Sequence, residues 1–408
     1  MTQGRRAATI FVLVAVFIDM LGMGLVFPVL PLLVGDFAPG RAEQAYWVGA
    51  LTVAYGVMQF LFAPLLGALS DHFGRRAVLI LSIVGLGLNY LLIVVAPNLW
   101  VLLAARILGG ITGATFSVAN AYIADISAPE ERAKGFGQVG AVFGLGFICG
   151  PLMGGVLGEI DLHLPFVAAA GLSFLNALYG LFVLPESLPK ERRAPFLLAK
   201  ANPFAALYAL SRLAGTGRLV GIYALYQLAH MILVTTWVLF THFRFGWGAM
   251  MTGLSLFCVG LMSALVQGVL LGPAVKRFGE EHIALAGLGI GVLSYALYGL
   301  ATEGWMVFAI MFVLGWLGFM TVPSLQALVS RSADPHAQGV TMGSLTAIMS
   351  IASVVAPVMG FPILAAVQDF PPADIRVGAT FFLCAMFQAV AFALAVPRLL
   401  RRSGLPAV

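Results

Sequence analysis

Long apolar runs separated by short polar turns alternate along the whole chain. Each run holds about 20 residues, which at about 1.5 Å per residue can cross a hydrocarbon layer of about 30 Å as a helix. In lipid a helix satisfies its own backbone hydrogen bonds, so helices are expected here. The pattern predicts twelve spans, at residues 8–33, 45–69, 77–96, 99–123, 135–158, 165–184, 217–241, 250–275, 282–301, 304–328, 338–366 and 375–397.

The composition supports a chain that lies in a lipid bilayer. Of its 408 residues, 61% are hydrophobic and only 10% are charged, whereas soluble domains are about 45–50% apolar. We therefore expect an all-α membrane protein. The three cysteines (Cys149, Cys258 and Cys384) lie singly in apolar runs, so neither a disulfide framework nor a metal site is predicted.

The basic residues predict how the chain is oriented. If both termini lie on one side, that side receives most of the 22 Lys and Arg residues, including the pairs Arg5-Arg6 and Arg75-Arg76. The positive-inside rule then places both termini in the cytoplasm. The net charge of +5 is thereby explained by topology, and no nucleic-acid partner is expected.

The two halves of the chain resemble each other. Matching residues recur at an offset of 205 or 206 positions: Gly67, Phe73 and Gly74 with Gly272, Phe278 and Gly279; Trp100, Gly110 and Gly113 with Trp305, Gly315 and Gly318; Pro151, Met153 and Gly154 with Pro357, Met359 and Gly360. Such a repeat is typical of transporters with a central site between their halves. We expect a six-helix half at 1–184, a cytoplasmic linker at 185–216 and a second six-helix half at 217–408.

A compact polar turn separates the second and third spans. It contains Gly67, Asp71, Gly74, Arg75 and Arg76, with glycine near both ends as in a sharp turn at a membrane surface. The second copy has Lys276 where the first has Asp71, so a latch made by Asp71 and Arg75 would exist in the first half only. This asymmetry fits a conformational gate, and it equally fits drift of a duplicated loop.

Several of these motifs resemble the major facilitator superfamily, in particular its drug:proton antiporters and, within them, the bacterial tetracycline efflux (TetA-like) group. The segments that carry the resemblance are the turn at 67–76, Arg106 with Gly109 and Gly110, Gly150-Pro151 with Gly154-Gly155, 19–31, 111–115, 121–126, 184–187 and 325–327. The resemblance implies the major facilitator fold and a monomer in the bacterial inner membrane. It also implies a gate formed by the polar turn with Asp125, and an antiporter motif formed by Gly150, Pro151, Gly154 and Gly155, which simple helix packing would also explain.

Three ionisable residues inside predicted spans are candidates for proton coupling. Asp19 is the only acidic residue well inside a span, where a charge costs about 2.5–3.5 kcal/mol, so it either exchanges a proton or forms a structural pair with Arg106. For Arg106 the resemblance implies a part in proton transfer, and a helix-to-helix staple is the alternative. His230 is either a second proton site or a neutral core histidine.

Uncharged polar residues in the spans are candidates for the wall of a substrate cavity, because an amide that faces lipid would be left unsatisfied. Some of them are expected to join helices instead. The candidates are Gln59, Asn89, Asn120, Gln227, Gln267 and Gln326.

Taken together, the sequence predicts a proton-coupled antiporter that exports a small amphiphilic, tetracycline-like compound by alternating access. Exporters of another drug or of an endogenous metabolite, and a proton-coupled importer, are the alternatives. The tetracycline group has acidic residues in helices 3 and 9 and a histidine in helix 8, where this chain has Asn89, Gly291 and Ser263. Because nucleotide-binding and hydrolase motifs are missing, we expect neither an enzyme nor a cofactor.

Overall fold

The structure is a computed structural model of the 408-residue chain. It describes all residues except 1–2, 114, 129–130, 197–216, 333–337 and 403–408. Within the described residues there are helices and no strands, and twelve helical segments are long and apolar enough to cross a membrane. The expected fold class of twelve spanning helices is therefore confirmed. Most of the linker expected at 185–216 lies outside the described residues.

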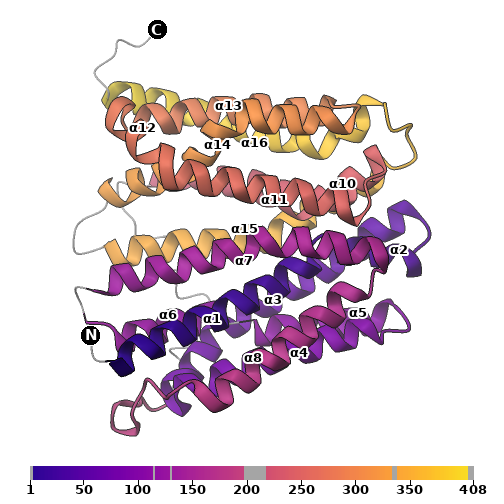
Figure 1. Ribbon diagram of the computed structural model, residues 1–408. Helices are drawn as coiled ribbons and strands as arrows, with labels where there is room; N and C mark the ends of the chain where they lie inside the picture. The colour runs from indigo at the N-terminus through magenta and orange to yellow at the C-terminus, as the bar shows by residue number, and fades with distance from the viewer. Residues whose placement is uncertain (1–2, 114, 129–130, 197–216, 333–337, 403–408) are drawn as a thin grey trace. The chain divides into compact units, whose positions relative to one another are not determined.

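The chain forms two compact units. Unit 1 contains residues 1–39, 50–203 and 248–257, and unit 2 contains 40–49, 204–247 and 258–408. The expected boundaries at 184 and 217 stay a prediction. Figure 1 shows long helices running side by side within each unit.

Unit 1 is built on α1, which packs against α7 and α8, while α4 packs against α5 and α8. Its elements are α1 (Gln3–Val26), α2 (Leu30–Phe37), most of α3 (Arg41–Phe73), α4 (Arg75–Val94), α5 (Leu99–Thr112), α6 (Thr115–Ile126), α7 (Arg132–Ile160), α8 (Leu164–Val183) and η2 (Lys190–Arg192).

Unit 2 repeats these packing relations. The α10 helix packs against α15, as α1 does against α7 in unit 1. The α13 helix packs against α14 and α16, as α4 does against α5 and α8. Its elements are α10 (Gly217–Phe245), the second part of α11 (Ala249–Leu265), η4 (Val266–Leu270), α12 (Leu271–Phe278), α13 (Glu280–Leu300), α14 (Gly304–Ser332), α15 (Gln338–Ala366), η6 (Ile375–Gly378) and α16 (Ala379–Arg402).

Two spans depart from the continuous helices that the hydropathy pattern predicts. The span expected at 99–123 is divided into α5 and α6, because Gly113 leaves helical geometry with φ −75° and ψ 46°. The span expected at 250–275 contains the π-helical turn η4. Hydropathy records how apolar a stretch is, so it does not detect a local break of the backbone.

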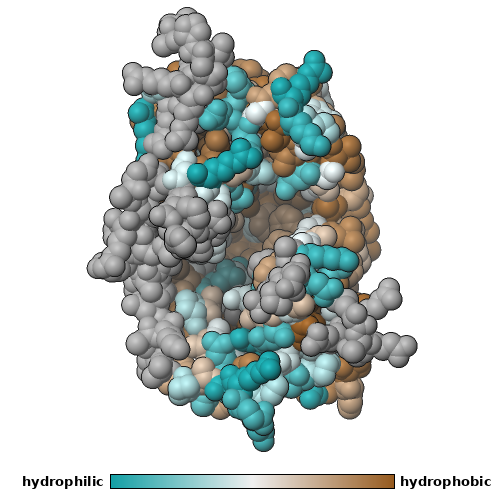
Figure 2. Space-filling model, turned by 90° about the vertical axis from the view of Figure 1, so that its left-hand side faces the viewer, coloured by the Kyte–Doolittle hydropathy of each residue, from teal (hydrophilic) through white to brown (hydrophobic). Residues whose placement is uncertain are grey.

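One end of the helices is rich in hydrophilic residues (Figure 2). Figure 2 looks at the end of the molecule that lies on the left in Figure 1, and hydrophilic residues gather on this face. The glycines at which α4 and α13 begin, Gly74 and Gly279, have φ of 105° and 78°, a conformation that other residues rarely adopt.

Candidate functional site

Asp19 lies in the middle of α1 and only 4% of its surface is exposed. The Thr115 hydroxyl, at the start of α6, is within reach of its carboxyl group. However, neither Asp19 Oδ2 nor Thr115 Oγ1 makes a hydrogen bond of good geometry. A buried polar atom without a hydrogen-bond partner costs about 1–3 kcal/mol of stability. This carboxyl group therefore does not stabilise the fold in this conformation, and it is free to gain and lose a proton.

Arg106 and Asp19 do not form the ion pair that the sequence left open as an alternative. No ion pair joins the two side chains in the described part of the chain. Instead, the Arg106 guanidinium lies over the ring of Tyr55 on α3, with Cζ 4.0 Å from the ring centroid, and its Nε has no hydrogen-bond partner. The alternative of a structural Asp19–Arg106 pair is thus absent from this conformation.

Tyr55 and Tyr90 lie near both Asp19 and Arg106, and the sequence interpretation missed both tyrosines. The hydroxyl group of each tyrosine lies within electrostatic range of both Asp19 and Arg106, so these four side chains belong to one cluster. The Tyr55 hydroxyl has no hydrogen-bond partner. A tyrosine within an apolar run is a weak sequence signal, because its ring belongs in a core and only its hydroxyl needs a partner.

The Gln59 side chain forms a hydrogen bond at the break between α5 and α6. Gln59 on α3 donates from Nε2 to the carbonyl oxygen of Gly113 at 3.1 Å, which satisfies an acceptor freed by the break. α6 begins at Thr115, the neighbour of Asp19, so its amino-terminal end lies inside the span. Discontinuous helices of this kind are where transporters commonly bind ions and polar groups.

The other amides occupy different environments. Asn89 is 1% exposed, packs against Gly109 and has no partner for either amide atom, and Gln227 is buried with Oε1 unpartnered. Gln326 donates to the Tyr223 hydroxyl at 3.2 Å. Gln267 is exposed and donates to Ser263 on its own turn, and Asn120 is half-buried. Their place in a substrate cavity stays a prediction.

His230 lies on α10 in unit 2, whereas Asp19 belongs to unit 1. It is half-buried, and its ring stacks on Tyr226 at a centroid distance of 6.1 Å and an interplanar angle of 18°. This contact fits a histidine packed in the core, and a role in proton coupling stays a prediction.

The polar turn between α3 and α4 is organised by Arg75. Its guanidinium contacts Asp71 Oδ1 at 2.6 Å, Asp125 Oδ2 at the end of α6 at 3.0 Å, and the Ser70 hydroxyl at 2.6 Å. Arg75 thus joins the end of α3 and the start of α4 to the end of α6. The residues expected to form a gate, apart from Gly67 and Arg76, meet at this point.

The chain after α8 covers this turn, which the sequence interpretation did not foresee. Glu186 Oε1 accepts from the backbone N–H of Arg75 at 2.9 Å and so caps the start of α4. Ser187 donates to Asp125 at 3.2 Å, and the Tyr122 hydroxyl donates to the Pro185 carbonyl at 2.7 Å. Arg76 donates to the Leu181 carbonyl. The end of α8 and residues 185–187 thus contact the Arg75 backbone, the Arg76 side chain and Asp125.

Gly74 and Gly67 are expected to respond differently to alanine. A Cβ at Gly74 would overlap the Glu186 carboxylate on a residue whose φ is 105°, whereas a Cβ at Gly67 would meet nothing within 4 Å. We expect Gly74→Ala to lower stability by about 1–3 kcal/mol and Gly67→Ala to be neutral or mildly stabilising. Thermal unfolding of the two variants in one detergent provides the comparison, and equal melting temperatures would contradict it.

The glycines of α7 let two helices approach closely. A Cβ at Gly150 would lie 2.6 Å from Gly24 Cα on α1, and a Cβ at Gly154 would overlap the Leu25 carbonyl. A Cβ at Gly155 would lie 2.8 Å from the Ala249 carbonyl at the start of α11. Pro151 lies inside the same helix. This motif therefore fixes how α7 packs on α1, the helix that carries Asp19.

The comparisons with known proteins agree with this fold. A family model described as Major Facilitator Superfamily matches residues 12–357. The class C tetracycline resistance protein of Escherichia coli is 44% identical over 359 residues, 88% of this chain and 90% of that protein. The class G tetracycline resistance protein of Vibrio anguillarum is 37% identical over 359 residues, with coverage of 88% and 90%.

Solved structures show the same architecture. The human organic anion transporter MFSD10 (TETRAN) is 25% identical, with a TM-score of 0.68, 96% of this chain covered and 99% of that one. A bacterial homologue of the human lysosomal transporter Spinster, at 16% identity, has a TM-score of 0.74 with 97% of each chain covered and supports the fold alone. The family resemblance of the sequence is thereby confirmed: the chain belongs to the major facilitator superfamily.

Proposed function

We propose that this protein is a proton-coupled antiporter that exports a small amphiphilic, tetracycline-like compound from the bacterial cytoplasm. It lies in the inner membrane with both termini in the cytoplasm, and it works by alternating access. The tetracycline resistance proteins to which the chain is similar support a tetracycline-like substrate.

The observation that carries the proposal is the isolated carboxyl group of Asp19. It is buried in a spanning helix, lacks an ion-pair partner and has one oxygen without a hydrogen bond. A charge held in this way is costly, so the neutral form is favoured whenever water is excluded. When the site opens to water the carboxylate is stabilised and releases its proton, which gives the alternation that antiport requires.

Arg106 is proposed to bias this exchange rather than to carry the proton. A guanidinium stays charged at any physiological pH. In this conformation it lies on the Tyr55 ring, and its Nε is free to bind a ligand. A shift of Arg106 from the ring toward Asp19 would stabilise the carboxylate and favour proton release.

Export of a compound other than tetracycline is the second candidate. The residues where the tetracycline group has acids are uncharged here: Asn89 has an unpartnered amide, and Gly291 packs against Gln388. A neutral site of this kind favours an amphiphile recognised by hydrogen bonds over a charged chelate. An endogenous metabolite, or proton-coupled import, would use the same residues.

Transport into inverted membrane vesicles separates these possibilities. With an imposed pH gradient, acidic inside, we expect the vesicles to accumulate tetracycline. Lipophilic cations offered in place of tetracycline test the substrate class. Right-side-out vesicles test the direction of transport. Substrate uptake that is unaffected by the gradient would contradict proton-coupled export. Gradient-driven uptake of another compound, with tetracycline excluded, would favour the second candidate.

A further inference from the structure

Several spanning helices begin directly after a glycine, which has no side chain to cap them. The α11 helix is one of these, since it begins at Ala249 and follows Gly248. The first backbone N–H groups of a helix have no partner within it, and a Ser, Thr, Asp or Asn side chain at this place normally binds one of them. For α11 such a group has to come from another residue.

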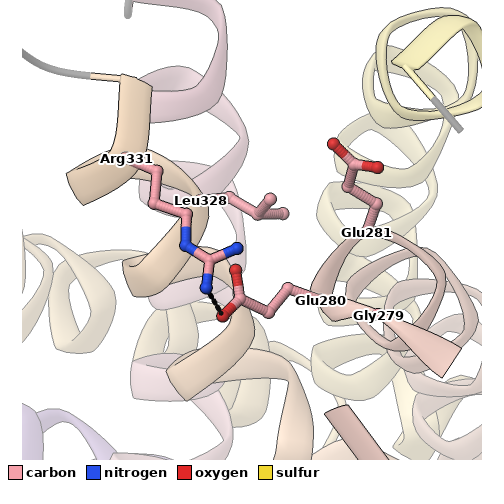
Figure 3. A pocket seen from close by; sticks show the side chains of 5 residues that line it. All are labelled: Gly279, Glu280, Glu281, Leu328 and Arg331. Carbon is pink, nitrogen blue, oxygen red and sulfur yellow. Dashed lines mark ion pairs between the residues drawn. The ribbon is translucent and has the colours of Figure 1, made fainter. Parts of the chain in front are cut away.

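Two helices that follow a glycine carry a carboxylate in their own first turn. The α3 helix has Glu43 there, and α13 has Glu280 and Glu281, which Figure 3 shows at its start. A negative charge at this place suits the positive end of the helix dipole. Glu280 also binds the Arg331 guanidinium at 3.0 Å. By contrast, the first turns of α4 and α11 contain no acidic residue.

Both α4 and α11 receive a glutamate from elsewhere in the chain. The α4 helix is capped by Glu186, which accepts from the Arg75 backbone N–H at 2.9 Å. At α11, Oε2 of Glu159, near the end of α7, accepts from the Met250 backbone N–H at 3.3 Å. Met250 is the second residue of α11, which is where an N-cap side chain binds. A Cβ at Gly248 would lie 3.2 Å from the same oxygen, so Glu159 fills the space of the missing side chain.

The Glu159 cap joins helices from different parts of the sequence repeat. The α7 helix belongs to the predicted half 1–184, and α11 belongs to the predicted half 217–408. Residues 248–257 nevertheless group with unit 1, while the rest of α11 belongs to unit 2. A Cβ at Gly155 would lie 2.8 Å from the Ala249 carbonyl oxygen, and a Cβ at Gly158 would lie 2.9 Å from Ala249 Cβ. The start of α11 is thus attached to α7 by close packing and by one carboxylate.

We propose that Glu159 is a conformational latch, whose carboxylate caps α11 only while α11 lies against α7. The inference rests on the proposed alternating access, in which the two halves of a transporter move relative to each other. When α7 and α11 part, the first turn of α11 loses its partner, because Gly248 has no side chain to replace it. The cap therefore favours the conformation described here over one in which the two helices are apart.

Thiol labelling without substrate tests the latch. Thr252 lies one turn after Ala249 and is 0% exposed, so a cysteine there reacts only when α11 opens. The full-length chain, with its three native cysteines replaced by alanine, carries Thr252→Cys in lipid nanodiscs, and its reaction with a maleimide is timed. Glu159→Ala should raise the rate about fivefold, the effect of losing one N-cap. Met250→Cys, at an exposed position, is the control and should react equally fast with and without Glu159.

A cap supplied by α11 itself separates a latch from an ordinary helix cap. Gly248→Ser gives α11 its own N-cap, and the φ of Gly248 is not positive, so serine suits this backbone. Added to Glu159→Ala, Gly248→Ser should restore the melting temperature. Labelling at 252 should nevertheless stay about fivefold faster than with natural Glu159, because the new cap is present whether or not α7 is near.

Two results would overturn the proposal: an unchanged labelling rate in Glu159→Ala, or a rate that Gly248→Ser returns to the natural value. If Thr252→Cys misfolds, Ala249→Cys takes its place, since Ala249 is 2% exposed and packs on Gly158. The labelling needs neither a substrate nor a pH gradient. Transport that ignores the gradient would therefore contradict the proposed function and leave the latch standing.

Discussion

Asp19→Asn is expected to abolish gradient-driven accumulation while leaving the protein folded. The amide is close in size to the carboxyl group and needs no ion-pair partner, and Asp19 has none to lose. One proton moving down a gradient equivalent to about 100 mV supplies about 2.3 kcal/mol, enough for about fiftyfold accumulation of a neutral substrate. The variant should reach a ratio of about 1 by the same energy balance.

Measured accumulation in inverted vesicles checks this expectation. Asp36→Asn, an exposed acidic residue on α2, is the matched control and should accumulate substrate like the natural protein. Retained coupling in Asp19→Asn would place the proton site elsewhere, with His230 the next residue to replace. Binding of substrate without accumulation would separate a coupling defect from a binding defect.

Gly154→Ala is expected to be among the most destabilising single-methyl substitutions in α7. The added Cβ would overlap the Leu25 backbone carbonyl, which cannot rotate away as a side chain can, so α1 and α7 must move apart. Forced overpacking of this kind costs about 1–3 kcal/mol, with more when backbone must shift. Because α1 carries Asp19, transport should fall together with stability.

Gly144→Ala is the control for this prediction, since it lies on the same helix and its Cβ would meet nothing within 4 Å. Removing a helix-interior glycine there should be neutral or stabilising by up to about 1 kcal/mol. Thermal unfolding of both variants in lipid nanodiscs decides the matter. Similar losses at 144 and 154 would show that the close approach of α7 to α1 does not limit stability.

Features that depend on a local stretch of residues were predictable from the sequence. The twelve spans follow from runs of apolar residues, and Asp19 is conspicuous because it interrupts one of them. The glycine rhythm of α7 likewise predicted a close helix crossing, and Gly150 and Gly154 do contact α1. In each case the physical cause acts over one or two helical turns.

Features that depend on which helices meet were not predictable. The Tyr55–Arg106 stacking, the Gln59 contact with Gly113 and the capping of α4 by Glu186 each join residues between about 50 and 110 positions apart. A single sequence gives the chemistry of these side chains but not their partners. The Glu280–Arg331 ion pair of unit 2 was missed for the same reason, because its two residues lie on different helices.

The central claim is that protons and substrate exchange through Asp19. The most direct measurement is proton flux in proteoliposomes that hold a pH-sensitive dye, with an outward substrate gradient and no imposed pH gradient. The natural protein should drive protons inward as substrate leaves, and Asp19→Asn should let substrate leave without proton movement. Substrate efflux without proton uptake in the natural protein, or unchanged proton uptake in Asp19→Asn, would contradict the account.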